Sequence, residues 1–240
     1  MKVAQFEFDG SGCVAVELNG KWINYSKAFA SYHLLEHDIA LRQPESITEM
    51  LQLGIWGPDD MKTIVAHVKK NRLQRYLLLP KEAVLKAPIA RPPKIVALGL
   101  NYVLHAKEGN FAVPKEPILF VKVGSSVIGP NETIRIPRGL GRMDHEAELA
   151  VVVGKTATEV KKKDAYKHIA GYTICNDVSA RDLQTKDIAA KHPWFRSKSF
   201  DTFSPIGPWI VTPDEFRPPV HVNVECRVNG EVRQKANTRD

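Results

Sequence analysis

The sequence predicts an α+β fold rich in β-strands, with a small mixed domain followed by a larger strand-rich domain. Short apolar runs separated by glycine and proline dominate the chain from residue 94 onward. Helical spacing is concentrated in residues 46–76. The stretch APIARPPK at 87–94 holds three prolines and cannot lie inside a helix. We therefore place the domain boundary there and expect domains at 1–88 and 89–240.

The N-terminal domain is predicted to begin with a hairpin. Residues 1–10 and 13–25 alternate apolar and polar side chains as strands do, and Asn19-Gly20 is a hairpin turn signal. Residues 46–76 then show helical spacing that is interrupted at Gly57-Pro58. A small α+β unit accounts for both patterns.

The larger domain is predicted to hold many short strands and few helices, which favours a mixed, largely antiparallel sheet over a doubly wound one. A second hairpin signal lies at Asn229-Gly230. The predicted strands cover 94–100, 117–123, 133–137, 148–154, 168–176, 207–211 and 221–233, and the predicted helices lie around 101–109, 159–166 and 178–190.

Composition is that of a soluble globular protein. Of 240 residues, 43% are hydrophobic and 25% charged, and no apolar run is long enough to span a bilayer. The N-terminus alternates and carries acids, unlike a secretory signal. The three cysteines are far apart, which fits buried thiols in a reducing compartment. We expect a cytoplasmic protein without a membrane partner.

The net charge of +7 invites a nucleic-acid interpretation, but the basic residues are dispersed. Their one cluster, Lys161 to Lys163, lies in a polar stretch without interleaved aromatic residues, where a solvated loop explains it better. The surplus charge also favours anionic small substrates by electrostatic steering. We therefore expect a small anionic substrate and no nucleic acid.

A pair of carboxylates stands at the start of an apolar strand in MDHEAELAVVVGK, residues 143–155. Side chains alternate across a strand, so Glu146 and Glu148 point to one face, about 7 Å apart. On a half-buried surface two like charges are costly unless a positive charge lies between them. The alternative is an exposed strand end with both acids in water.

The segment YTICNDVSARDLQTKD, residues 172–187, offers three further polar groups. If it turns helical at Asp177, then Asp177, Arg181 and Gln184 share one face. An acid, a guanidinium and an amide together suit a site that binds a substrate carboxylate beside a metal. Alternatively, Asp177 is only a helix N-cap with Arg181 as its ion partner.

Two other segments carry candidate catalytic groups. Lys198 lies among aromatic, glycine and proline residues, which is typical of a pocket wall. The alternative is a surface lysine whose stem covers an apolar surface while its ammonium group stays in water. His105 and Glu108 are one helical turn apart, so the carboxylate could orient the imidazole as a base that activates water. A solvated surface pair is the alternative.

The acids in these segments suit a hard cation. Oxygen ligands from Glu146, Glu148 and Asp177 favour Mg²⁺, with Mn²⁺ as the other candidate. Zinc is less favoured, because these stretches offer neither a cysteine set nor a second histidine in position to bind it.

Six motifs in order resemble the fumarylacetoacetate hydrolase family: GLNYxxHAxE, PxxFxKxxxSxxGP, DxExELAVVxGK, GYTxxNDVSARDxQ, WFRxKSFDxFxPxGPW and NGExRQxxxT. The resemblance covers about 94–240, and the preceding region resembles the small leading domain of prokaryotic members. It implies a mixed β-sandwich roll that forms a homodimer. The family domain continues past NTRD at 237–240, so we expect this chain to be incomplete at its C-terminus.

The resemblance also implies roles for the candidate residues. The metal ligands fall on Glu146, Glu148 and Asp177, the substrate-binding positions on Arg181, Gln184 and Lys198, and a lid acid–base pair on His105 and Glu108. Lys198 would also take part in catalysis.

The implied activity is Mg²⁺-dependent hydrolysis of a C–C bond in a small 2,4-dioxo acid of the acylpyruvate or fumarylpyruvate type. Two alternatives stay open. One is an isomerase or decarboxylase of a 2-hydroxy-diene dioate or oxo acid in aromatic-compound catabolism. The other is a truncated binding protein without catalytic activity.

Overall fold

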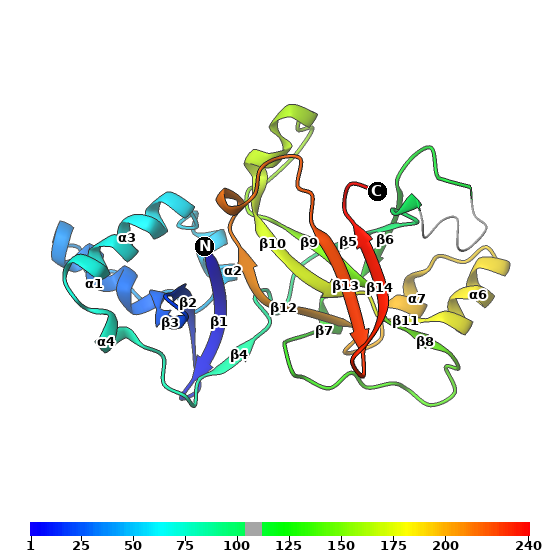
Figure 1. Cartoon of the computed structure of the whole chain (residues 1–240), viewed down its shortest axis with the longest axis horizontal. Helices are drawn as coiled ribbons and strands as arrows, with labels where there is room; N and C mark the ends of the chain where they lie inside the picture. The colour runs from blue at the N-terminus through cyan, green and yellow to red at the C-terminus, as the bar shows by residue number, and fades with distance from the viewer. Residues whose placement is uncertain (104–111) are drawn as a thin grey trace. The chain divides into compact units, whose positions relative to one another are not determined.

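The structure is a computed structural model that describes residues 1–103 and 112–240 (Figure 1). The chain forms two compact units, which are described separately. The first contains Met1–Ile89, Ala150–Thr173 and Gly207–Arg217, and the second Ala90–Leu149, Ile174–Ile206 and Pro218–Asp240. The strand-rich α+β architecture confirms the predicted fold class. The division into domains 1–88 and 89–240 stays a prediction.

The first unit begins with an antiparallel meander. Strands β1 (Lys2–Phe8), β2 (Ser11–Leu18) and β3 (Lys21–Asn24) pair in sequence order, and β4 (Val84–Lys86) also pairs with β1. The predicted turn at Asn19-Gly20 is confirmed, and both of its residues have positive φ, at 53° and 76°.

Helices of the first unit cover the meander. They are α1 (Tyr25–His37), α2 (Ile47–Gln52), α3 (Pro58–Lys70) and α4 (Gln74–Leu77), and α1 and α3 lie side by side (Figure 1). Asn24 caps α1, because its side chain accepts a hydrogen bond from Lys27 N at 2.9 Å. The shared core includes Val16, Phe29 and Ile64. The predicted break at Gly57-Pro58 separates α2 from α3.

The largest sheet has the strand order β3-β2-β1-β12-β10-β9, with β9 (Ala147–Val153), β10 (Ile169–Asn176) and β12 (Ser204–Val211). β12 also pairs in parallel with β7 (Val127–Ile128), while the other pairings with a defined register are antiparallel. The expected largely antiparallel sheet is therefore present.

Three short strand pairs complete the second unit. β5 (Ile95–Gly99) pairs with β6 (Ile118–Lys122), β8 (Met143–Asp144) with β11 (Ser179–Ala180), and β13 (Asn223–Val228) with β14 (Glu231–Asn237). All three pairs are antiparallel. The β13–β14 hairpin turns at the predicted Asn229-Gly230.

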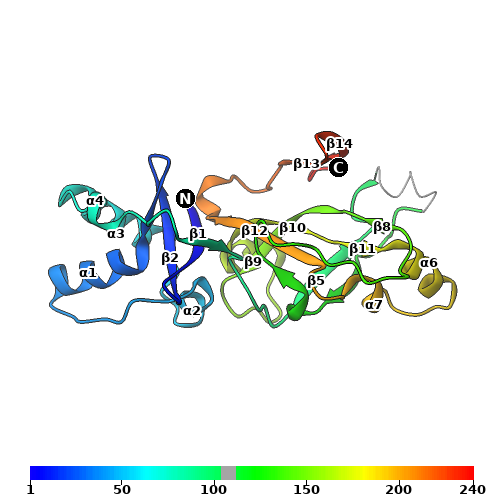
Figure 2. The ribbon, with the colours of Figure 1, turned by 90° about the horizontal axis from the view of Figure 1, so that it is seen from below.

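Helices of the second unit are short. α6 (Arg181–Ala189) and α7 (Phe195–Lys198) lie next to each other (Figure 2). Val178, Ala180 and Phe203 form a small apolar cluster nearby. Three-residue 3₁₀ turns span Gly124–Ser126 here and Pro213–Glu215 in the first unit.

Three expected elements differ from the structure. Residues 133–137 form no strand. The helix expected over 178–190 begins only at Arg181, because Ser179 and Ala180 pair with β8. The helix expected over 159–166 is a 3₁₀ helix at Lys162–His168. Within the residues that the structure describes, no helix combines the length and apolar character needed to cross a membrane.

Candidate functional site

Backbone hydrogen bonds bring two acidic segments of the second unit together. Asp177, which directly follows β10, donates its backbone N–H to the carbonyl of Glu146 at 2.7 Å. In return, Glu146 N donates to the side-chain oxygen of Asn176 at 3.1 Å. The start of β9 and the end of β10 are thus held together where their carboxylates emerge.

Lys198 joins these two carboxylates. Its Nζ donates to Glu146 Oε2 at 2.8 Å and to Asp177 Oδ2 at 2.6 Å, and it lies 5.0 Å from the ring centroid of Phe120. The residue is only 2% exposed. The alternative of a lysine whose stem covers an apolar surface while its ammonium group stays in water does not hold, because the ammonium group is buried with the stem.

A second buried lysine, Lys122 at the end of β6, was not singled out from the sequence. Its Nζ donates to Asp177 Oδ1 at 2.7 Å and to the backbone carbonyl of Lys198 at 2.5 Å. Burial lowers the pKa of Lys122, and the charge of Asp177 opposes that shift. The available signal was a lysine that ends the otherwise apolar strand ILFVK.

Arg181, the first residue of α6, binds the other side of Glu146. Its Nη2 donates to Glu146 Oε1, its Nε to Asp144 Oδ2 at 2.7 Å, and its Nη1 to Gln184 Oε1 at 2.5 Å. Gln184 is buried. Asp144 is a second residue that sequence reasoning missed, although it falls within the quoted DxExE motif.

Asp177, Arg181 and Gln184 do not share a helix face as expected. Asp177 precedes β11, and the helix starts four residues later at Arg181. Glu146 provides the link, since it receives hydrogen bonds from both Lys198 and Arg181 while Lys198 also binds Asp177. The three residues therefore meet through tertiary contacts rather than through helical periodicity.

The two glutamates at the start of β9 have opposite electrostatic environments. Burial alone would raise the pKa of Glu146, but Lys198 and Arg181 outweigh it and hold that pKa at about 2. Burial and the negative charges of Glu146 and Asp177 raise the pKa of Glu148 to about 7, against the positive charge of Lys198 and a hydrogen bond from Asn101. The negative charge around Glu148 is therefore larger than the nearby positive charge neutralises.

The residues fit a divalent cation by their donor chemistry. Glu146, Glu148 and Asp177 offer carboxylate oxygens, which hard cations prefer, and added positive charge would offset the crowding around Glu148. No group of three acidic, histidine or cysteine side chains is arranged as a ready-made metal site among the described residues. Lys198 contacts two of the three carboxylates here, so the metal centre stays a prediction.

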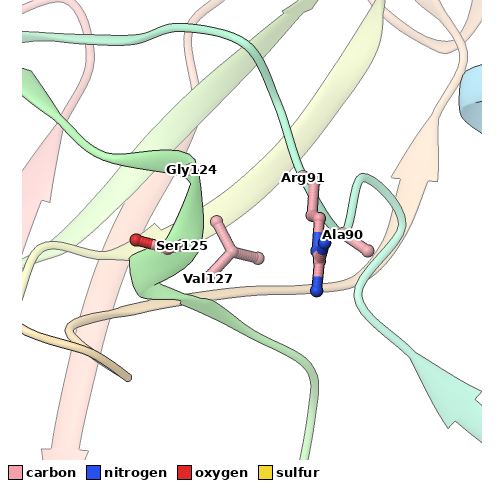
Figure 3. Close-up of a pocket in the computed structure, with 5 residues that line it drawn as sticks. All are labelled: Ala90, Arg91, Gly124, Ser125 and Val127. Carbon is pink, nitrogen blue, oxygen red and sulfur yellow. The ribbon is translucent and has the colours of Figure 1, made fainter.

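Two candidates and one hollow stay outside the assignment of this cluster. His105 and Glu108 fall outside the described residues, and their roles stay predictions. A hollow of about 420 Å³ is lined by Ala90, Arg91, Gly124, Ser125 and Val127 (Figure 3). None of the acidic or basic side chains of the cluster lines it, so we do not assign it to the site.

Comparison with known proteins gives matches over much of the chain. Residues 94–240 match the family described as "Fumarylacetoacetate (FAA) hydrolase C-terminal". The mitochondrial oxaloacetate tautomerase of Xenopus laevis is 42% identical over 201 residues, which are 84% of this chain and 61% of that protein. The chain thus spans about three fifths of the length of the curated relatives it matches.

Solved structures match over the whole chain. Fumarylacetoacetate hydrolase from Exiguobacterium antarcticum aligns with a TM-score of 0.73 and 32% identity, covering 100% of this chain and 76% of that one. Maleylpyruvate hydrolase from Sphingobium sp. SYK-6, in complex with manganese (II) ion and pyruvate, aligns with a TM-score of 0.69 and 28% identity, covering 100% and 78%. All three named proteins are enzymes.

Proposed function

Because the chain belongs to the fumarylacetoacetate hydrolase family, we propose that it is a divalent-metal-dependent enzyme acting on a small anionic 2-oxo acid. One observation in the structure carries the proposal. Lys198 and Arg181 converge on Glu146 in a largely buried cluster, with Asp177 and the charge-crowded Glu148 beside it. Buried charges of both signs are costly to maintain for stability alone and are typical of functional sites.

The finer proposal is hydrolysis of a C–C bond in a 2,4-dioxo acid of the acylpyruvate or fumarylpyruvate type. Water adds to the acyl carbonyl, the bond to the methylene carbon breaks, and the electron pair passes to a pyruvate enolate that then takes a proton. The products are a carboxylic acid and pyruvate. The complex of the maleylpyruvate hydrolase with pyruvate supports this class of substrate.

Keto–enol isomerisation is the second candidate, because the oxaloacetate tautomerase is a 42% identical relative. That reaction also proceeds through an enolate, so the same binding groups serve it without an attacking water. Decarboxylation of an oxo acid, or isomerisation of a 2-hydroxy-diene dioate in aromatic-compound catabolism, would use the same enolate stabilisation.

Glu146, Glu148 and Asp177 would hold the cation, Mg²⁺ or Mn²⁺. When bound, it would supply a Lewis acid that stabilises negative charge on the substrate's oxo or enolate oxygen. Glu146 and Asp177 accept hydrogen bonds from Lys198, so its ammonium group lies where it could also bind an anionic substrate that the cation would hold beside these carboxylates.

The basic side chains would bind and orient the substrate. Arg181 has a planar guanidinium that is already fixed by Asp144 and Gln184, which suits it to bind the substrate carboxylate. Lys198 would donate hydrogen bonds to the enolate oxygen. For hydrolysis, His105 oriented by Glu108 would take the proton of the attacking water.

The test is turnover of an acylpyruvate, oxaloacetate and a 2-hydroxy-diene dioate with Mg²⁺, with Mn²⁺ and with EDTA. We expect metal-dependent turnover that EDTA abolishes. Pyruvate formed with a carboxylic acid from the acylpyruvate would identify a hydrolase, whereas pyruvate formed with CO2 from oxaloacetate would identify a decarboxylase. Arg181→Gln should lose most of kcat/KM, while the exposed Arg227→Gln serves as the matched control. Activity that is equal in EDTA would contradict the proposal. A homodimer in the cytoplasm stays a further prediction, checked by light scattering and by localisation of a tagged chain.

A further inference from the structure

A side chain from the C-terminal hairpin binds the backbone between the two glutamates. Gln234 of β14 donates its Nε2 to the carbonyl of Ala147 at 2.8 Å and accepts the N–H of Ala147 on its Oε1 at 2.8 Å. A side-chain amide has a carbonyl oxygen that accepts and an NH2 group that donates, so it can pair with a peptide group as another peptide group does. Gln234 therefore satisfies both backbone groups of Ala147 at once.

The position of β9 in the sheet explains why Ala147 needs such a partner. β9 is the last strand in the order β3-β2-β1-β12-β10-β9, so one of its edges has no neighbouring strand in that sheet among the residues that the structure describes. Backbone N–H and C=O groups at a buried edge must be hydrogen-bonded elsewhere. Ala147 is buried, and the side chain of Gln234 takes the place of the missing strand.

An irregularity in the hairpin accompanies Gln234. Cys226 lies opposite Gln234, but the next residue, Arg227, lies opposite Val232, so Arg233 is an extra residue in β14. Such a bulge bends its strand and changes the direction of neighbouring side chains. The irregularity thus lies next to a side chain of the hairpin that forms hydrogen bonds with β9.

The stretch from Glu146 to Glu148 is therefore fixed from two directions. Asn176 and Asp177 hold the backbone of Glu146, and Gln234 holds that of Ala147. We propose that Gln234 is a positioning residue, which sets the spacing of the Glu146 and Glu148 carboxylates for a divalent cation. This inference rests on the proposed metal-dependent function.

Two variants of Gln234 and one control test the inference. Gln234→Met keeps the side-chain length but removes both hydrogen bonds. Gln234→Glu keeps an oxygen that can accept from Ala147 N–H, but it loses the donor and places a negatively charged oxygen near the carbonyl of Ala147. The control is Lys235→Ala, which changes an exposed neighbour on the same strand.

The first readout is hydrogen exchange of the Ala147 amide in metal-free protein, measured by NMR. We expect faster exchange in Gln234→Met and retained protection in Gln234→Glu and in Lys235→Ala. The second readout is Mn²⁺ affinity, measured as free Mn²⁺ by electron paramagnetic resonance. We expect about 10- to 100-fold weaker binding in Gln234→Met, as is usual when an outer partner of a metal ligand is lost.

The outcomes separate this inference from the proposed function. Mn²⁺ binding that is equal in wild type and Gln234→Met overturns the inference and leaves the metal-dependent function standing. A wild-type protein that binds no Mn²⁺ overturns the proposed function, whatever the exchange data show. If Gln234→Met does not fold, the wild-type protein decides, since an Ala147 amide that exchanges as fast as an exposed amide contradicts its hydrogen bond to Gln234.

Discussion

Buried charges with alternating sign are the main feature at the level of single residues. Lys122 and Lys198 both bind Asp177, while Lys198 and Arg181 both bind Glu146. Removing one member of such a network leaves an unpaired charge out of water, whereas an apolar replacement of the whole network would often be neutral. Stability alone therefore does not explain the cluster, which agrees with the binding role proposed for it.

Glu148→Gln is expected to stabilise the metal-free protein at high pH. Since the pKa of Glu148 in the folded chain is about 7, above its ordinary 4.5, folding favours the protonated form. The ionised side chain should then cost about 3 kcal/mol at pH 8, and the cost should vanish as pH falls below its ordinary pKa. Urea unfolding in EDTA at pH 5 and pH 8 measures the difference.

The same variant has the opposite effect when metal is present. Saturating Mn²⁺ should raise the midpoint of unfolding of the wild type, because a cation that binds only the folded chain adds to its stability. Glu148→Gln should show little or no such rise. A variant that is less stable than wild type in EDTA at pH 8 would refute the charge-crowding account.

Lys122→Met should destabilise the fold by about 3 kcal/mol, because Asp177 loses one of its two ammonium partners inside the protein. Lys186→Met is the matched control, since Lys186 is exposed on α6 of the same unit. Chemical unfolding of both variants gives the comparison. Equal stability of Lys122→Met and wild type would show that the buried pair adds nothing.

The site residues that could be identified from the sequence are those whose pattern lies within one short segment. Strand alternation placed Glu146 and Glu148 together, and the acid, guanidinium and amide of one segment indicated Asp177, Arg181 and Gln184. Lys122 and Asp144 were missed, because they reach the cluster through β6 and β8, whose pairing partners no local pattern specifies.

At the level of elements, α7 is placed by contacts with the β5–β6 pair. Gly99 ends β5, and a Cβ there would lie 2.5 Å from Cζ3 of Trp194, at the start of α7. The Trp194 ring also packs on Phe120, with centroids 5.6 Å apart. Because Lys198 ends the same helix, this contact also helps to place its ammonium group.

Gly99→Ala should therefore displace Trp194, destabilise the protein by about 1–3 kcal/mol and lower kcat. Gly99→Ala combined with Trp194→Leu should be less destabilised than the sum of the single variants, because the clash is removed. Thermal unfolding of the four proteins forms a double-mutant cycle. Additive effects would show that the two side chains do not conflict.

The elements that the sequence predicted well carry strong local signals. Both Asn-Gly hairpins are present, since these residues accept the positive φ that the turns require. The strand expected at 133–137 is absent, and Ile134 instead packs against the Val178 cluster without strand pairing. Helix α1 went unnoticed because its apolar Leu34 and Leu35 are exposed and blur the amphipathic pattern.

At the level of the whole molecule, the net charge of +7 should act on the approach of the substrate. We expect kcat/KM for an anionic oxo acid to fall severalfold as ionic strength rises from about 0.01 M to about 0.15 M, because salt screens the attraction. Turnover at saturating substrate should stay constant. Steady-state kinetics at five salt concentrations tests this. An unchanged kcat/KM would mean that the surplus positive charge does not attract the substrate to the site.

The hydrogen bonds between Gln234 and Ala147 join residues 87 positions apart, and this separation bears on how the protein is made. Ribosomes add roughly 5–20 residues per second, so about 4–17 s pass between synthesis of the strand and arrival of its partner. During that interval the edge of β9 lacks this partner, and unpaired strand edges promote aggregation. The edge of β9 at Ala147 is therefore open to other strands until the hairpin that carries Gln234 has been made.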